Sequence, residues 1–263
     1  MRFVKFVKKR KLNILASVAA IVFMWLIWLI AYYAEGNDLV IPSFSATMKS
    51  LGALLVSAKF YRALGYTMLT ALASFVISYF LAGICAAAAT LSKFAREFLK
   101  PVIGFLRTLP TLAVVLVLLI WTSPRSAPII VTVLVLFPIV YAELTASIDG
   151  IGGDIKEMCS LYKVPPRDRL FKVYLPLAAP PVLAQTGANY SLGLKVMISA
   201  EVLASTRYSY GVMMQTARLY SDIPSLMALT LAAVIIGAVL NIALSQFSRF
   251  TDRWTRKEGG DAN

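Results

Sequence analysis

The sequence predicts an all-α integral membrane protein with six membrane-spanning helices. Three observations support this prediction: the composition is strongly apolar, the apolar residues come in long blocks, and positive charge is concentrated in alternate connecting segments. Of the 263 residues, 59% are hydrophobic and 15% are charged, and the mean hydropathy is +0.75. Soluble domains average about 45–50% apolar and about 25% charged residues, so the composition argues against an ordinary soluble domain.

Six blocks are long enough to cross a bilayer as helices, because about 20 helical residues span a hydrocarbon core of about 30 Å. A lone strand would leave its backbone groups unpaired in lipid, so each block is predicted to be a helix. In chain order, the predicted spans are residues 12–33, 63–91, 102–121, 127–148, 181–203 and 226–247. The first is expected to be retained, since it is longer than the apolar core of a signal peptide and no A-x-A pattern follows it.

The basic residues predict the orientation. With the N-terminal arm in the cytoplasm, the cytoplasmic segments contain 18 Lys and Arg residues and the outer segments contain 6. The positive-inside rule predicts this asymmetry, and the reverse orientation would invert it. We therefore expect a multi-pass protein of the cell (cytoplasmic) membrane with both termini in the cytoplasm. The net charge of +13 lies in short loops beside the lipid, so no nucleic-acid partner is expected.

The expected domain organisation follows from these spans. A basic cytoplasmic arm covers residues 1–11, a transmembrane domain covers 12–250, and a polar cytoplasmic tail covers 251–263. The chain contains no histidine, and its two cysteines lie in different segments, so neither a metal site nor a disulfide is predicted. It also lacks a G-x-x-x-x-G-K-[ST] phosphate loop. We therefore expect a protein that is not an enzyme in its own right.

The connection between the fourth and fifth spans, residues 149–180, is the most informative loop. Loops of this length are usually functional or disordered, and this one is too apolar for disorder. Two short helices are predicted, over 154–163 and 167–176, with Asp154 as the N-cap of the first. Pro165 and Pro166 must separate them, because proline lacks an N–H and restricts the residue before it. The loop is therefore predicted to form a compact cytoplasmic knob.

The same loop resembles the signature of permease subunits of binding-protein-dependent ABC importers. That signature reads Glu-Ala-Ala, three residues, Gly, nine residues, Ile-x-Leu-Pro. In this chain Glu157 begins the pattern, Lys163 stands in place of the glycine, and Val173-Tyr174-Leu175-Pro176 ends it. Met158 and Cys159 replace the two alanines. The spacing and both ends match, while the interior departs from the pattern.

Other segments resemble the branch of this family that serves nitrate, sulfonate and taurine. They occur in the order which that branch shows: Pro101 to Ala113, Trp121, Phe137-Pro138-Ile139, Thr186-Gly187, Ala200-Glu201, Gly211 and Ala217-Arg218. The resemblance covers roughly residues 60–250 and implies a type I ABC importer permease bundle with a cytoplasmic coupling-helix loop.

The resemblance also implies partners. ATP and Mg would bind to separate ATPase subunits, and this chain would hold no cofactor. An extracytoplasmic binding protein would deliver the solute, and a second permease, either an identical copy or a more typical homologue, would complete the channel. The lipid bilayer surrounds the assembly.

In that family the loop docks into a groove on the ATPase subunit. The implied contact tip consists of Val164, Pro165, Pro166, Arg167, Asp168 and Arg169. Glu157, Leu175 and Pro176 would hold the loop against the membrane helices. Lys163 takes the place of a glycine that commonly supplies a left-handed turn at a helix end, a conformation that lysine adopts at a cost.

Two ionisable residues lie within the fifth predicted span, Lys195 deep inside it and Glu201 nearer its outer end. A charge at mid-membrane costs at least about 2.5–3.5 kcal/mol, so such groups face a partner or a watery cavity. Two interpretations stay open: both residues line the translocation pathway between permeases, or both are structural. Their separation corresponds to about 600° of helical rotation, so they are expected on different faces.

The predicted function is therefore that of a permease subunit which passes a small solute inward. The alternatives are a secondary transporter, which would work without an ATPase, and a membrane-embedded enzyme or scaffold. Internal repeats would favour the secondary transporter, and the sequence shows none. The sequence does not specify the solute.

Overall fold

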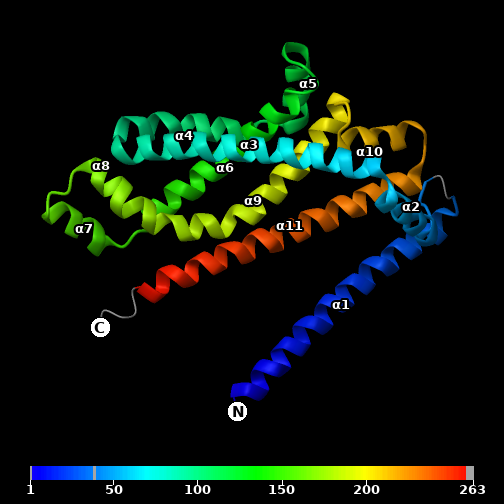
Figure 1. The fold of residues 1–263 in the computed structure, drawn as a ribbon, viewed down its shortest axis with the longest axis horizontal. Coiled ribbons are helices and arrows are strands. Elements are labelled where there is room, and N and C mark those ends of the chain that lie inside the picture. Colours follow the sequence, from blue (N-terminus) through cyan, green and yellow to red (C-terminus); the bar gives the residue numbers. More distant parts are fainter. Residues whose placement is uncertain (1, 38–39, 259–263) are drawn as a thin grey trace. The chain divides into compact units, whose positions relative to one another are not determined.

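The computed structural model describes residues 2–37 and 40–258, and these residues fold into helices joined by short connections without any strand (Figure 1). The chain divides into two compact units. One contains residues up to 57 together with 216–231, and the other contains 58–215 together with the residues from 232 onward.

The first unit is built on α1 (Arg2–Glu35) and α2 (Phe44–Val56). α1 contains the first predicted span. The indole N–H of Trp28 donates to the carbonyl of Pro42 at 3.1 Å, and the Trp28 ring meets Phe44 edge-on. These contacts fix the connection between the two helices. The sequence analysis did not predict α2.

The second unit contains the remaining helices. In chain order they are α3 (Ala58–Leu91), α4 (Lys93–Thr108), α5 (Thr111–Trp121), α6 (Ala127–Asp149), α7 (Gly153–Leu161), α8 (Pro166–Asp168), the π-helix η1 (Arg169–Tyr174) and α9 (Leu175–Ala204). Two further helices, α10 (Tyr210–Leu219) and α11 (Ile223–Glu258), each belong partly to this unit. The sequence analysis did not predict α10.

The core of the second unit is the packing of α3 against α6 and α9. The buried side of α3 is a stripe of small residues that recurs every three or four positions: Ala63, Thr67, Ala71, Ser74, Ser78, Ala82, Ala86 and Ala89. Small side chains allow helix backbones to approach closely in membrane bundles. Larger side chains from the other two helices, such as Leu136 and Leu194, are almost fully buried.

The prediction of one continuous helix over residues 102–121 is wrong. α4 ends at Thr108, α5 begins at Thr111, and the two helices meet at an angle of 96°. Pro110 is responsible, because it lacks an N–H and disfavours helical backbone in the residue before it. Leu109 accordingly has extended backbone angles, with φ −65° and ψ 124°.

Composition alone identifies only some of the predicted spans. Among the described residues, α3, α6 and the Ile223–Gln246 part of α11 are long and apolar enough to cross a membrane, and the bent pair α4–α5 adds a fourth candidate. α9 has 30 residues, but polar side chains such as Gln185 and Asn189 lower its hydropathy. Within α1, Val22–Glu35 is apolar but shorter than a full membrane span.

The predicted domain borders fall inside helices, since α1 begins at Arg2 and α11 continues to Glu258. Residue 1 of the arm and residues 259–263 of the tail lie outside the described residues.

Candidate coupling loop and pathway residues

The loop at residues 149–180 contains one separate helix, α7, and a second helical segment that is continuous with α9. α8, η1 and α9 follow one another without a break. The predicted end of the second helix at Pro176 is therefore wrong. Pro176 stands in the first turn of α9, where its missing N–H removes no hydrogen bond. Gly152, rather than Asp154, is the N-cap of α7, and Asp154 lies in the first turn.

A tight turn ends α7. The Lys163 N–H donates to the carbonyl of Ser160 at 3.0 Å, and the Val164 N–H donates to the carbonyl of Cys159 at 3.0 Å. This pair of bonds is the Schellman motif. Lys163 has φ 50°, so it occupies the left-handed position that the signature fills with glycine. The turn is thus formed in spite of the substitution.

The tip that follows this turn is partly exposed and internally braced. Pro165, Pro166 and Arg167 are exposed. Arg169 instead points back: its Nη2 donates to the carbonyl of Val164 at 3.3 Å and to that of Cys159 at 3.4 Å. Among the six predicted tip residues, Arg169 therefore holds the turn together, while the prolines and Arg167 form the outer surface.

The base of the loop is held by apolar residues that the sequence analysis did not select. Ile148, Ile151, Leu170, Tyr174 and Ala178 form a buried cluster. The residues expected to hold the loop, Glu157, Leu175 and Pro176, are exposed in this chain. Amphipathic spacing in the η1 segment accounts for the difference, since it turns Leu170 and Tyr174 inward.

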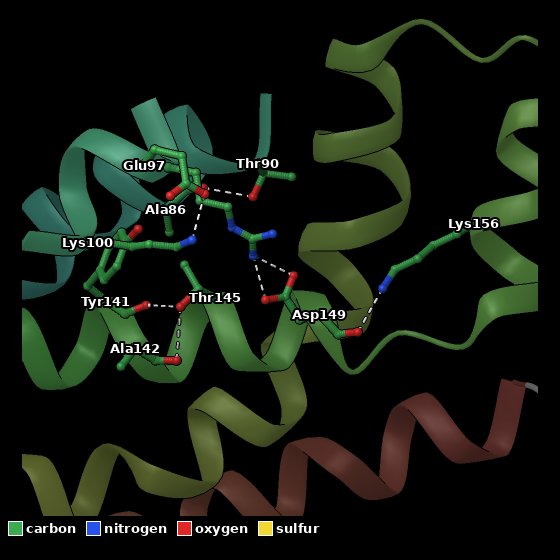
Figure 2. Close-up of polar contacts among 10 residues, drawn as sticks. Ala86, Thr90, Glu97, Lys100, Tyr141, Ala142, Thr145, Asp149 and Lys156 are labelled. Carbon is green, nitrogen blue, oxygen red and sulfur yellow. Dashed lines mark hydrogen bonds and ion pairs between the residues drawn. The ribbon is translucent and has the colours of Figure 1, made fainter. Parts of the chain in front are cut away.

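A polar junction at Asp149 adds to this base. The guanidinium of Arg96, on α4, contacts both carboxylate oxygens of Asp149 at 2.5 and 2.6 Å. The ammonium of Lys156, on α7, donates to the Asp149 backbone carbonyl at 2.7 Å. Figure 2 shows Asp149 at the end of α6 with Lys156 reaching toward it. The junction joins α4, α6 and α7.

The two ionisable residues of α9 lie in different surroundings, as their spacing predicts. Lys195 is exposed, whereas Glu201 is 1% exposed. Lys195 belongs to an exposed stripe on α9 that also contains Gln185, Ala188 and Ser199. Glu201 lies inside the packing of its own chain and forms no part of that stripe.

The profile of a family described as "Binding-protein-dependent transport system inner membrane component" matches residues 78–257, more than half of the chain. The chain belongs to this family. It is therefore a permease subunit of a binding-protein-dependent ABC importer, a multi-pass protein of the inner membrane, and ATP hydrolysis in such importers is carried out by a separate subunit.

Individual relatives agree with this assignment. The permease is 26% identical over 217 residues to SsuC of Bacillus subtilis (strain 168), a protein named for aliphatic sulfonates transport, and the match covers 81% of this chain and 76% of SsuC. It is 24% identical over 111 residues to ProW of Escherichia coli (strain K12), a glycine betaine/proline betaine transport permease. That second match covers 42% of this chain and 31% of ProW.

Solved structures show the same fold. A chain of an amino acid ABC transporter superimposes with a TM-score of 0.65 at 15% identity, covering 76% of the permease and 97% of that chain. A chain of a bacterial alginate ABC transporter, crystallised with its periplasmic protein, superimposes with a TM-score of 0.62 at 16% identity, covering 90% and 94%. The predicted fold class, a type I ABC importer permease, is confirmed.

The permease also contains polar contacts that sequence reasoning did not find. Thr67 on α3 donates to Glu201 on α9 at 2.7 Å. Asn189 on α9 donates to Tyr79 at 3.0 Å and to Glu143 at 2.7 Å. The only signals in the sequence are the polar residues themselves, each within an apolar block, because the partners lie far apart along the chain.

Proposed function

We propose that the loop at residues 149–180 couples this permease to its ATPase subunit, with the exposed surface of the tip at Pro165, Pro166 and Arg167 as the contact. The proposal rests on the geometry of the tip, which is exposed to solvent and has hydrogen bonds behind it. The Schellman turn at Lys163 and the bonds from Arg169 brace it from within. A braced element transmits a domain movement that a slack loop would absorb.

The route from the tip into the membrane helices supports the same proposal. η1 follows the tip directly and continues into α9. Leu170 and Tyr174 of η1 are buried against Ile148, in the last turn of α6, and Ile151, just beyond that helix. π-Helical turns are rare and frequently occur at functional sites. A displacement of the tip therefore acts on α9 and on the end of α6 together.

Around this element we propose an assembly of two permeases, two ATPase subunits and one external binding protein. ATP and Mg bind on the ATPase subunits, and both termini of the permease face the cytoplasm. The 18-to-6 distribution of basic residues supports this orientation. The second permease is an identical copy in the simplest assembly, and a homologous chain with a more typical loop is the alternative.

We further propose that Lys195 lines the translocation pathway. An exposed ammonium in the middle of a membrane helix is unfavourable against lipid and favourable against water or a second subunit. A cation there suits an anionic solute, and the resemblance to SsuC agrees with a substrate of the aliphatic sulfonate class. Identification of the ligand held by the binding protein tests this substrate class, and a cationic ligand would contradict it.

The test of the coupling loop uses two variants. Pro165→Ala combined with Pro166→Ala should let helical structure continue through the break and displace the tip. Arg167→Glu reverses a charge on the exposed surface and should weaken binding of the ATPase by about tenfold, or about 1.4 kcal/mol. The measurements are co-purification of the ATPase subunit and transport-coupled ATP hydrolysis in reconstituted vesicles.

Lys100→Glu is the matched control for Arg167→Glu. It reverses an exposed charge that is paired with Glu97 on α4, away from the tip. If the tip variants bind the ATPase and transport as the parent and the control do, the loop is not the coupling element.

A further inference from the structure

The first turn of α10 is tied to α3 and α9 by four residues, Thr67, Glu201, Tyr210 and Gly211, which we call the α10 joint. The Thr67 hydroxyl donates to Glu201 Oε2 at 2.7 Å and accepts from the backbone N–H of Tyr210 at 2.9 Å. The backbone N–H of Gly211 donates to the same carboxylate oxygen at 3.2 Å. The first N–H groups of a helix have no acceptor within that helix. Here side chains from two other helices supply the acceptors.

The joint is closed to solvent and closely packed. Thr67 is 0% and Glu201 1% exposed. A Cβ on Gly211 would meet Glu201 Cβ and would lie 2.6 Å from the backbone nitrogen of Val202. The absence of a side chain at Gly211 therefore allows α10 to approach the backbone of α9 directly.

The connection from α9 to α10 is also held in an unusual conformation. Ser205 has φ 52° and Tyr208 has φ 59°. Residues other than glycine adopt this left-handed region at a cost and keep it only where the surroundings impose it. The short connection, together with the joint, fixes the start of α10 on the end of α9.

A buried carboxylate is a poor choice for stability alone. Glu201 Oε1 has no hydrogen-bond partner among the described residues, and apolar side chains of similar size often stabilise a buried position at least as well as charged ones. The carboxylate does suit the start of a helix, where the helix dipole carries positive charge. The carboxylate is therefore better suited to holding the start of α10 in place than to filling the core.

α9 connects this joint with the coupling loop. It has 30 residues, or about 45 Å at 1.5 Å per residue. One end continues from η1, and the other carries the joint (Figure 1). We propose that Glu201 and Thr67 are positioning residues for transport: they make α10 move as one piece with α9, so that a displacement of the loop repositions α10 on the outer face. This inference rests on the proposed docking of the loop.

The first test measures the joint in the permease itself. Thr67→Val removes the bridging hydroxyl and keeps the shape of the side chain. Thr70→Val is the matched control, because the Thr70 hydroxyl bonds to carbonyls of its own helix at 3.0 and 3.1 Å. The probe is Ala63→Cys, since Ala63 is 3% exposed and lies one turn before Thr67 on α3.

Labelling uses a membrane-impermeant maleimide added from outside to cells expressing the full chain, with Cys85 and Cys159 changed to Ala. We expect slow labelling in the parent and in Thr70→Val, and labelling about tenfold faster in Thr67→Val, because the Tyr210 N–H loses the Thr67 acceptor and the Glu201 carboxylate loses one of its donors. Thr67→Ser should restore slow labelling. Equal rates in Thr67→Val and Thr70→Val would overturn the proposal.

The second test separates positioning from general stability. The permease is reconstituted with its ATPase, and its liganded binding protein is titrated. For Thr67→Val we expect the maximal stimulated hydrolysis to fall by about tenfold, while basal hydrolysis and the half-saturating concentration of binding protein stay within about twofold. A change in the half-saturating concentration alone, or a parallel loss of basal and stimulated hydrolysis, would overturn the proposal. Absence of stimulation in the parent would instead refute the coupling loop, whatever the labelling shows.

Discussion

Replacing Lys163 by glycine is expected to stabilise the turn that ends α7. Lys163 has φ 50°, a conformation that costs an L-residue roughly 1–2 kcal/mol. Glycine adopts it freely but loses roughly 0.5–1 kcal/mol more conformational free energy on folding. The net gain in the free energy of local opening is therefore roughly 0–1.5 kcal/mol, and its midpoint of about 0.8 kcal/mol corresponds to about fourfold slower hydrogen exchange.

The assay is hydrogen exchange followed by mass spectrometry on peptides that cover residues 158–169. The Lys163 and Val164 amides donate the two bonds of the turn, so their exchange reports its opening. Lys163→Val should act in the opposite direction, because a β-branched residue fits the left-handed region poorly. Ser205→Gly relieves the same type of strain beyond α9 and should leave these peptides unchanged. If the glycine and valine variants shift exchange in the same direction, left-handed strain does not control the turn.

Two further predictions concern packing and charge. Gly187→Ala should lower the free energy of unfolding of the solubilised permease by roughly 1–3 kcal/mol, because the new Cβ would lie 2.7 Å from the Asn241 carbonyl oxygen. Gly237→Ala has no atom within 4 Å of its Cβ and should raise stability by about 0.5–1 kcal/mol; equal effects of the two variants would contradict the packing argument. Asp149→Asn should lower stability by less than about 1 kcal/mol, since the pair with Arg96 is solvent-exposed. A larger loss that persists at high salt would show that the pair contributes more than its exposure implies.

Much of the fold follows from hydropathy, because long apolar blocks have few other stable solutions in lipid. The bounds of α6, for example, differ from the predicted span by a single residue. The bend between α4 and α5 could be predicted from the sequence, because Pro110 lies inside the predicted third span. α2 and α10 were not predicted, because they are helices of only 13 and 10 residues that lie between the long apolar blocks.

The loop and the α10 joint differ in how far the sequence predicts them. The turn at Lys163 is local, so the spacing from Glu157 and the following prolines indicate where it must lie. The joint is not local: Thr67 and Glu201 are 134 positions apart. The sequence indicates that Glu201 needs a partner or a watery cavity, but it does not identify Thr67 and Gly211 as the residues that supply the partner.

Lys195 and Glu201 show two different ways in which a charged residue is accommodated within a membrane helix. Backbone carbonyls inside a helix bundle are already used by the helices, so a buried ammonium finds few acceptors there. Free N–H groups, by contrast, are available at every helix start, and a carboxylate can accept them. The first turn of α10 offers such groups to Glu201, and Thr67 adds a hydroxyl donor. This difference in available partners accounts for the exposed position of Lys195 and the buried position of Glu201.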